Sequence, residues 1–155
     1  MLKLILGLCI VFCSALIGLH FSQRLTERKR ILQEFSALLK KAEVMISYSA
    51  ADLCEVFSDN FGDYRFTYGE PFEKQWNDMV SQYKSVLTDG DISVLTGFAQ
   101  GIGATDTENQ SRHIGMYISL LDERIQSANK DIEEKSKLYR VLPVSVGLML
   151  SVLLI

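Results

Sequence analysis

Two cysteines near the start of the chain are the first residues whose types and spacing could do chemistry. Cys9 and Cys13 lie one helical turn apart and could ligate a metal ion, but no histidine or acidic residue accompanies them. Cys54 stands alone, so the three cysteines give no disulfide pattern. We interpret them as free, apolar side chains, and the lack of a pair in the middle of the chain fits a reducing compartment.

The histidines, acidic pairs and glycines offer no catalytic arrangement. His20 and His113 show no metal-ligand spacing, and a lone histidine is usually structural or exposed. Acidic pairs such as Glu133 and Glu134 are most simply a solvated helix surface. The Gly-Ile-Gly segment at 101–103 lacks the third glycine of a dinucleotide fingerprint and follows a helical pattern, which indicates a turn. The sequence therefore predicts no enzyme, no cofactor and no metal site.

A polar cluster directly after this glycine turn is the best candidate for a binding surface. Helix capping explains Asp106 and Glu108, because the Thr-Asp-Thr-Glu segment at 105–108 fits a capping box. The amide and guanidinium side chains that follow are unusually polar for a chain that only closes a turn. The candidate partner-binding residues are Asp106, Glu108, Asn109, Gln110 and Arg112.

The elements that position these residues lie in a chain with two apolar ends and a polar middle. Residues 4–19 and residues 142–155 carry no charge. The 155 residues include 16 basic and 19 acidic side chains, and a net charge of −3 gives no reason to expect nucleic acid as a partner. This distribution is typical of a small membrane protein. We predict a transmembrane helix at 1–21, one domain at 22–141 and a C-terminal membrane segment at 142–155.

The first apolar segment is either a retained span or a cleaved secretory signal. Lys3 is followed by about 18 apolar or small residues, which is enough for one crossing of the bilayer. A signal peptide would use the Cys-Ser-Ala segment at 13–15 as its small-residue cleavage site. We favour the retained span because the apolar run continues to Phe21.

The second apolar segment is short for a full crossing. The segment 142–155 would form a helix of about 21 Å, against a hydrocarbon core of about 30 Å. Pro143 can kink its start, and a crossing requires a thinned bilayer or a span that extends back past a snorkelling Arg140. The alternatives are a half-inserted hairpin arm and a tail that packs on the first span. We favour insertion with a full crossing.

Basic residues border both apolar segments on the side of the middle domain. Only Lys3 and the amino terminus precede the first segment, and no basic residue follows the second. The positive-inside rule therefore predicts that the middle domain faces the cytoplasm. The basic run at 24–30 could also bind anionic lipid head groups or a neighbouring subunit. The predicted topology residues are Arg24, Arg28, Lys29, Arg30 and Arg140.

Apolar residues in alternating three- and four-residue steps predict helices throughout the middle domain. We expect helices over about 26–48, 51–60, 71–86, 88–103 and 107–142, the last of roughly 36 residues. Thr88 and Asp89 are the expected caps of the fourth helix. A brief extended piece at 65–68 has no second strand to pair with. The predicted fold is all-α, an antiparallel helical bundle flanked by an N-terminal transmembrane helix and a short C-terminal membrane segment.

Three parts of the chain resemble the stage III sporulation protein AB family. They are Leu16–Gly18 with Phe21–Arg28, then Gly101–Gln110, and finally Tyr139–Leu148. The family form of the second part is a Leu-Gly-x-x-Asp-x-x-x-Gln turn before the long helix. In the third part Pro143 stands where the family usually has glycine. The similarity runs through the whole chain in order.

This resemblance implies an endospore-forming bacterium and a channel-like complex that links mother cell and forespore. The family is similar to a reduced inner-membrane platform protein of type II secretion and type IV pilus systems. By that analogy, the chain would lie in the mother-cell membrane facing the forespore. Its partners would be membrane lipid, other membrane subunits of the channel, a cytoplasmic secretion-type ATPase and, as an open alternative, further copies of itself. No enzyme activity is implied.

Two functional hypotheses follow. The first is a non-catalytic membrane scaffold whose helical domain docks the ATPase. The second is a two-span membrane sensor, or ligand-binding helical bundle, that faces the cell exterior. The arginine-rich flank disfavours the sensor orientation, and so does the expectation that no cytoplasmic output domain follows the second apolar segment.

Overall fold

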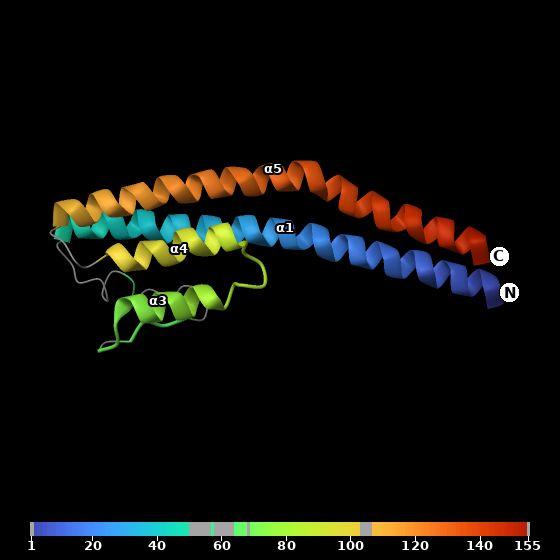
Figure 1. Cartoon of the computed structure of the whole chain (residues 1–155), viewed down its shortest axis with the longest axis horizontal. Helices are drawn as coiled ribbons and strands as arrows, with labels where there is room; N and C mark the ends of the chain where they lie inside the picture. Colours follow the sequence, from blue (N-terminus) through green and yellow to red (C-terminus); the bar gives the residue numbers. More distant parts are fainter. Residues whose placement is uncertain (1, 50–56, 58–63, 68, 103–106, 155) are drawn as a thin grey trace. The chain divides into compact units, whose positions relative to one another are not determined.

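Four helices make up most of the part of the chain that the computed structural model describes, namely residues 2–49, 57, 64–67, 69–102 and 107–154. Their bounds are α1 Leu2–Ser49, α3 Phe72–Ser81, α4 Asp89–Gly101 and α5 Thr107–Leu154 (Figure 1). Within these ranges there is no β-strand, so the all-α prediction is confirmed. The helix expected at 51–60 lies outside the described residues except for Phe57, and so does most of the capping box expected at 105–108.

The two long helices extend further than predicted. α1 has 48 residues and runs without interruption where a break between 21 and 26 was expected. No glycine or proline lies between those positions to stop it. α5 also has 48 residues and continues through Pro143, where we expected it to end. Across the described ranges, none of the helices combines the length and the apolar character needed to cross a membrane.

α3 ends earlier than its apolar spacing predicted. The helix stops at Ser81, and the backbone then forms tighter turns in which Tyr83 N donates to Val80 O at 3.1 Å and Lys84 N to Ser81 O at 3.3 Å. Thr88 starts α4 as expected. Its hydroxyl accepts from Asp91 N and the Asp91 carboxylate accepts from Thr88 N, which is a complete capping box.

The chain forms two compact units. The helix-pair unit consists of residues 1–29 and 127–155, and the bundle unit consists of residues 30–126. α1 and α5 each contribute to both units, while α3 and α4 belong to the bundle unit alone.

In the helix-pair unit, α1 and α5 lie side by side and antiparallel, with both chain ends at the same end of the unit (Figure 1). Apart from one aromatic contact, Phe21 with Tyr139 at 5.7 Å between ring centroids, the side chains that face each other are small or polar. The facing pairs, in order along α1, are Ser14 with Gly147, Gly18 with Pro143, Ser22 with Ser136, and Arg28 with Asp131.

Glycine allows the two helices of this unit to approach closely. A Cβ at Gly18 would overlap the Tyr139 carbonyl oxygen, and one at Gly147 would lie 2.7 Å from Ser14 Oγ. Tyr139 is four residues before Pro143, so its carbonyl is the one that Pro143 cannot reach with an N–H. α1 therefore covers the backbone oxygen that the proline leaves without its helical donor, which fits the continuation of α5 past this residue.

The bundle unit has a core of large apolar side chains from all four helices. Its largest fully buried side chains include Phe35, Leu39, Phe57, Trp76, Met79, Leu95, Phe98, Ile114 and Leu121. α1 contributes an apolar stripe to this core. Leu32, Leu39 and Ile46 are fully buried, whereas Leu38 and Met45 are only partly buried.

Hydrogen bonds from two buried side chains fix α3 within the bundle unit. The indole Nε1 of Trp76 donates to Leu95 O on α4 at 2.7 Å, so the ring is satisfied although it is fully buried. Gln75 accepts from Thr67 N at 2.6 Å and donates to Thr67 O at 2.9 Å. This two-way bond ties the extended segment at 64–67 to α3.

Candidate functional site

The polar cluster predicted as a partner surface lies in the first two turns of α5. The side chains of Glu108 and Arg112 are 84% and 74% exposed and form an ion pair of 3.4 Å. Asn109 is exposed, and Gln110 is partly buried. Asp106 lies outside the described residues. The structure thus places four of the five predicted residues on one short stretch of helix.

His113 anchors this stretch to the end of α4. Its ring lies against Phe98, with centroids 5.8 Å apart, and against Tyr117 at 4.8 Å. Its Nε2 is 3.0 Å from the Phe98 carbonyl oxygen in the last turn of α4. The histidine is therefore a structural element of the corner between α4 and α5.

A row of glycines on α4 makes this contact possible. A Cβ at Gly101 would collide with the His113 ring, and one at Gly97 would lie 3.0 Å from the Tyr117 hydroxyl. In the first turn of α4, a Cβ at Gly90 would lie 2.7 Å from Arg124 Nη2. Each glycine thus accommodates one planar side chain of α5.

Sequence reasoning missed this row of contacts. It assigned Gly101 to a turn and did not consider Gly90 or Gly97. The available signal was the matched spacing, because the three glycines and the three planar side chains of α5 are both separated by seven and four residues.

The start of α4 is held to α5 by a buried carboxylate. Asp91 is fully buried and its Oδ1 accepts from Arg124 Nε at 2.7 Å. Its Oδ2 accepts from Thr88 N at 3.0 Å, and Arg124 Nη2 donates to the Thr88 hydroxyl at 3.1 Å. α4 is therefore fixed to α5 at both of its ends, which makes the bundle unit a firm support for the polar cluster.

The predicted topology residues have different environments. Arg24 and Arg30 are exposed, Lys29 is partly buried, and the side chain of Arg140 lies outside the described residues. Arg28 is only 5% exposed, and its Nη1 donates to Asp131 Oδ2 at 2.7 Å. Arg28 thus serves the contact between α1 and α5 in the helix-pair unit.

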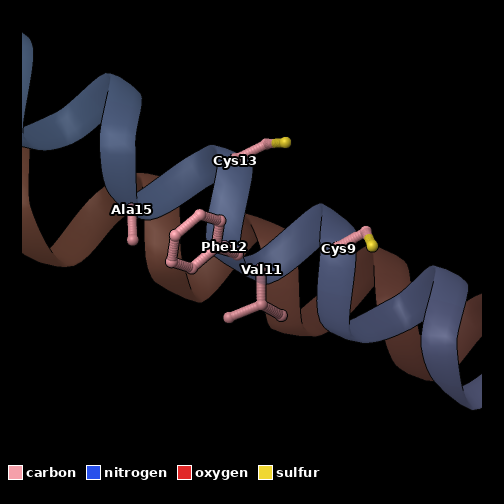
Figure 2. Close-up of a pocket in the computed structure, with 5 residues that line it drawn as sticks. All are labelled: Cys9, Val11, Phe12, Cys13 and Ala15. Carbon is pink, nitrogen blue, oxygen red and sulfur yellow. The ribbon is translucent and has the colours of Figure 1, made fainter.

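Hollows occur in both units, and two of them lie near predicted residues. The first, of about 440 Å³, runs along α1 of the helix-pair unit and is lined by Cys9, Val11, Phe12, Cys13 and Ala15. Figure 2 shows that both thiols project from one side of the helix, away from Val11 and Ala15. The described residues contain no group of three or more histidine, cysteine or acidic side chains that could hold a metal ion.

The second hollow, of about 290 Å³, is polar and lies in the bundle unit. Its lining residues are Gln33, Ser36, Ala37, Lys40, Asp122 and Ile125. Asp122 joins its two walls, because Oδ1 accepts from the Ser36 hydroxyl at 3.3 Å and lies 3.5 Å from Lys40 Nζ. It offers hydrogen-bonding and charged groups that already contact one another.

Comparison with protein families decides the identity of the chain at the level of family. The family model of stage III sporulation protein AB matches residues 3–63 and 62–155. The chain belongs to this family. No curated protein and no solved structure matches it.

Membership of the stage III sporulation protein AB family gives the chain a role in stage III of sporulation. The two matched segments together include both the helix-pair unit and the bundle unit. The resemblance of the three motifs to this family is thereby confirmed.

Proposed function

We propose that the chain is a non-catalytic scaffold subunit of a sporulation channel between mother cell and forespore. The apolar ends of the helix-pair unit, residues 1–21 and 142–155, are embedded in the mother-cell membrane, and the bundle unit faces the cytoplasm and docks a secretion-type ATPase. Other membrane subunits of the channel contact the helix-pair unit.

One observation carries this proposal: the helix-pair unit exposes its large apolar side chains, which a soluble coiled coil would bury between its helices. Among the described residues, thirteen of the fifteen exposed large apolar side chains belong to this unit, including Phe12, Ile17, Val141 and Met149. The contacts between its helices instead involve glycine, serine and proline, together with the Arg28–Asp131 ion pair and one aromatic contact, Phe21 with Tyr139. Helices in lipid associate in this way because burying large apolar side chains against each other gains little there.

The bundle unit supports the docking part of the proposal. Glu108, Asn109 and Arg112 at the start of α5 are exposed, and the contacts of His113 and Arg124 fix that helix to α4. A surface on a rigid element loses little conformational entropy when a partner binds. The exposed Glu108–Arg112 pair contributes little to stability by itself, so these side chains can exchange partners at small cost.

Co-purification with the ATPase from detergent extracts of sporulating cells tests the proposal. The triple variant Asp106→Ala, Asn109→Ala and Gln110→Ala should reduce ATPase recovery by about tenfold, which corresponds to a loss of about 1.4 kcal/mol. Adding Arg112→Ala should reduce recovery further.

The control changes another exposed charged surface of the same unit, with Glu70→Ala just before α3 and Glu73→Ala and Lys74→Ala in its first turn. These substitutions should leave recovery unchanged. Equal recovery with both sets of variants would remove the α5 surface from the proposal. Failure of the wild-type chain to retain any ATPase would remove the docking function itself.

A further inference from the structure

Arg28 is the only basic residue of the 24–30 run that the structure buries. It lies on α1 with 5% of its side chain exposed, and its guanidinium contacts Asp131 on α5. A charge at this depth is strongly unfavourable without its partner. Within the helix-pair unit, the alignment of α1 and α5 that brings Arg28 next to Asp131 is therefore energetically favoured.

Asp131 is engaged on both of its oxygens. Arg28 contacts Oδ2 at 2.7 Å, and Lys135, one turn along α5, contacts Oδ1. The hydrogen bond from Lys135 is the main reason why the pKa of Asp131 lies below its usual value, and the bond from Arg28 acts in the same direction. The carboxylate is thus ionised at neutral pH and faces two cations.

A second polar contact lies nearby in the same pair of helices. The hydroxyls of Ser22 and Ser136 are 2.9 Å apart, and Ser22 is 5% exposed. The Arg28–Asp131 and Ser22–Ser136 contacts each require one particular pair of residues to face each other. Both can form only at one alignment of α1 and α5.

The small residues of α1 cannot select this alignment by themselves. Ser14, Gly18 and Ser22 recur every four residues on one face of α1. If α5 moved by one helical turn, Gly147 would face Gly18 in place of Ser14, and close approach would still be possible. Packing of small residues therefore allows more than one alignment.

The charged pair penalises these shifted alignments in both directions. A shift of one turn one way would bring Arg28 opposite Lys135, a like charge. A shift the other way would bring it opposite Ser127, which leaves the guanidinium without a carboxylate. We propose that Arg28 and Asp131, with Ser22 and Ser136, form a polar lock that selects one register of α1 against α5.

Disulfide trapping in the full chain, purified in detergent, tests the lock. The background carries Cys9→Ser, Cys13→Ser and Cys54→Ser. The pair Ser14→Cys with Gly147→Cys reports the observed register, since a Cβ at Gly147 would lie 3.1 Å from Ser14 Cβ. The pair Ser14→Cys with Ser151→Cys reports a register shifted by one turn.

With an intact lock, the first reporter should form its disulfide at least about tenfold more than the second. Arg28→Met with Asp131→Leu replaces the lock by apolar side chains of similar size, which usually keeps a protein folded. This variant should bring the two yields within about threefold of each other. Circular dichroism checks that helicity is retained.

Arg28→Asp gives a directional test. In the observed register it would face Asp131 with a like charge, whereas in the shifted register it would face Lys135 with an opposite one. The shifted reporter should therefore become the dominant disulfide.

The matched control is Arg30→Met with Glu34→Leu, which removes an exposed ion pair from the same basic run. It should leave the ratio of yields unchanged. Exclusive formation of the first disulfide in the apolar variant, or an unchanged ratio in Arg28→Asp, would overturn the lock. These outcomes do not depend on membrane insertion or ATPase docking, so the lock and the proposed function can fail separately.

Discussion

At the scale of single residues, the structure gives its charged side chains two different uses. Asp91 is fully buried, and its contacts with Arg124 and the Thr88 backbone hold the start of α4 against α5. Glu108 and Arg112, by contrast, are exposed and pair only along their own helix. Buried charges are costly to leave unpaired, whereas exposed pairs are almost neutral. The first kind therefore determines the fold and the second is available for partners.

The importance of Asp91 can be measured by substitution. Asp91→Ala should lower the free energy of unfolding of the full chain in detergent by about 3 kcal/mol, because it removes a capping partner and the carboxylate that pairs with Arg124. Urea unfolding followed by helicity is the measurement. Asp89→Ala, an exposed acid in the first turn of the same helix, should cost less than about 1 kcal/mol. Equal losses would show that the buried pair has no special role.

At the scale of elements, glycine determines how closely helices approach. Gly97 and Gly101 of α4 accommodate the rings of Tyr117 and His113 in the bundle unit. Gly18 of α1 accommodates the Tyr139 carbonyl in the helix-pair unit. The neighbouring atom is a movable side chain in the first case and rigid backbone in the second. Substitution at Gly18 should therefore be the more disruptive.

Gly18→Ala should force α1 away from α5 because its Cβ would overlap a backbone oxygen. We expect a loss of about 1–3 kcal/mol in unfolding free energy and a lower yield of the disulfide between Ser14→Cys and Gly147→Cys. Gly115→Ala on α5 is the control, since its Cβ would meet only a Glu43 carboxylate oxygen at 3.2 Å. Alanine has the higher helix propensity by about 1 kcal/mol, so this control should be neutral or stabilising. Similar losses in both variants would contradict the role of Gly18.

At the scale of the whole molecule, the two units follow opposite packing rules. The bundle unit buries Phe35, Trp76 and Phe98 and exposes charges, as a water-soluble domain does. The helix-pair unit has glycine and serine at its helix contact and exposes large apolar side chains. This contrast supports our proposal that the apolar ends of the helix-pair unit lie in a membrane and the bundle unit in water.

The proposed orientation predicts a labelling pattern in cells that produce the chain without forming a forespore, so that the outer face of the membrane is accessible from the medium. In the same cysteine-free background, Ser81→Cys on exposed α3 should react with a membrane-impermeant thiol reagent only after permeabilisation. Leu2→Cys, at the opposite end of the first apolar segment, should react in intact cells. Labelling of Ser81→Cys in intact cells would instead favour the sensor hypothesis, in which the bundle faces outward.

Local sequence patterns predicted much of the secondary structure. The apolar stripes gave the helical class, Thr88 was identified as a cap, and Gly101 as the end of α4. These features depend on residues three or four positions apart, whose interactions are the same in every helical fold. The three local motifs at 16–28, 101–110 and 139–148 were sufficient to indicate the family.

Tertiary structure decided what those patterns could not. The burial of Arg28 depends on Asp131, which is 103 residues away in the chain. The role of Gly90, Gly97 and Gly101 became clear only from their contacts with side chains of α5. Pro143 likewise lies within α5 at the point where Gly18 of α1 packs against it. Local spacing determines which face of a helix is apolar, but only the alignment of two distant helices determines which residue each side chain meets.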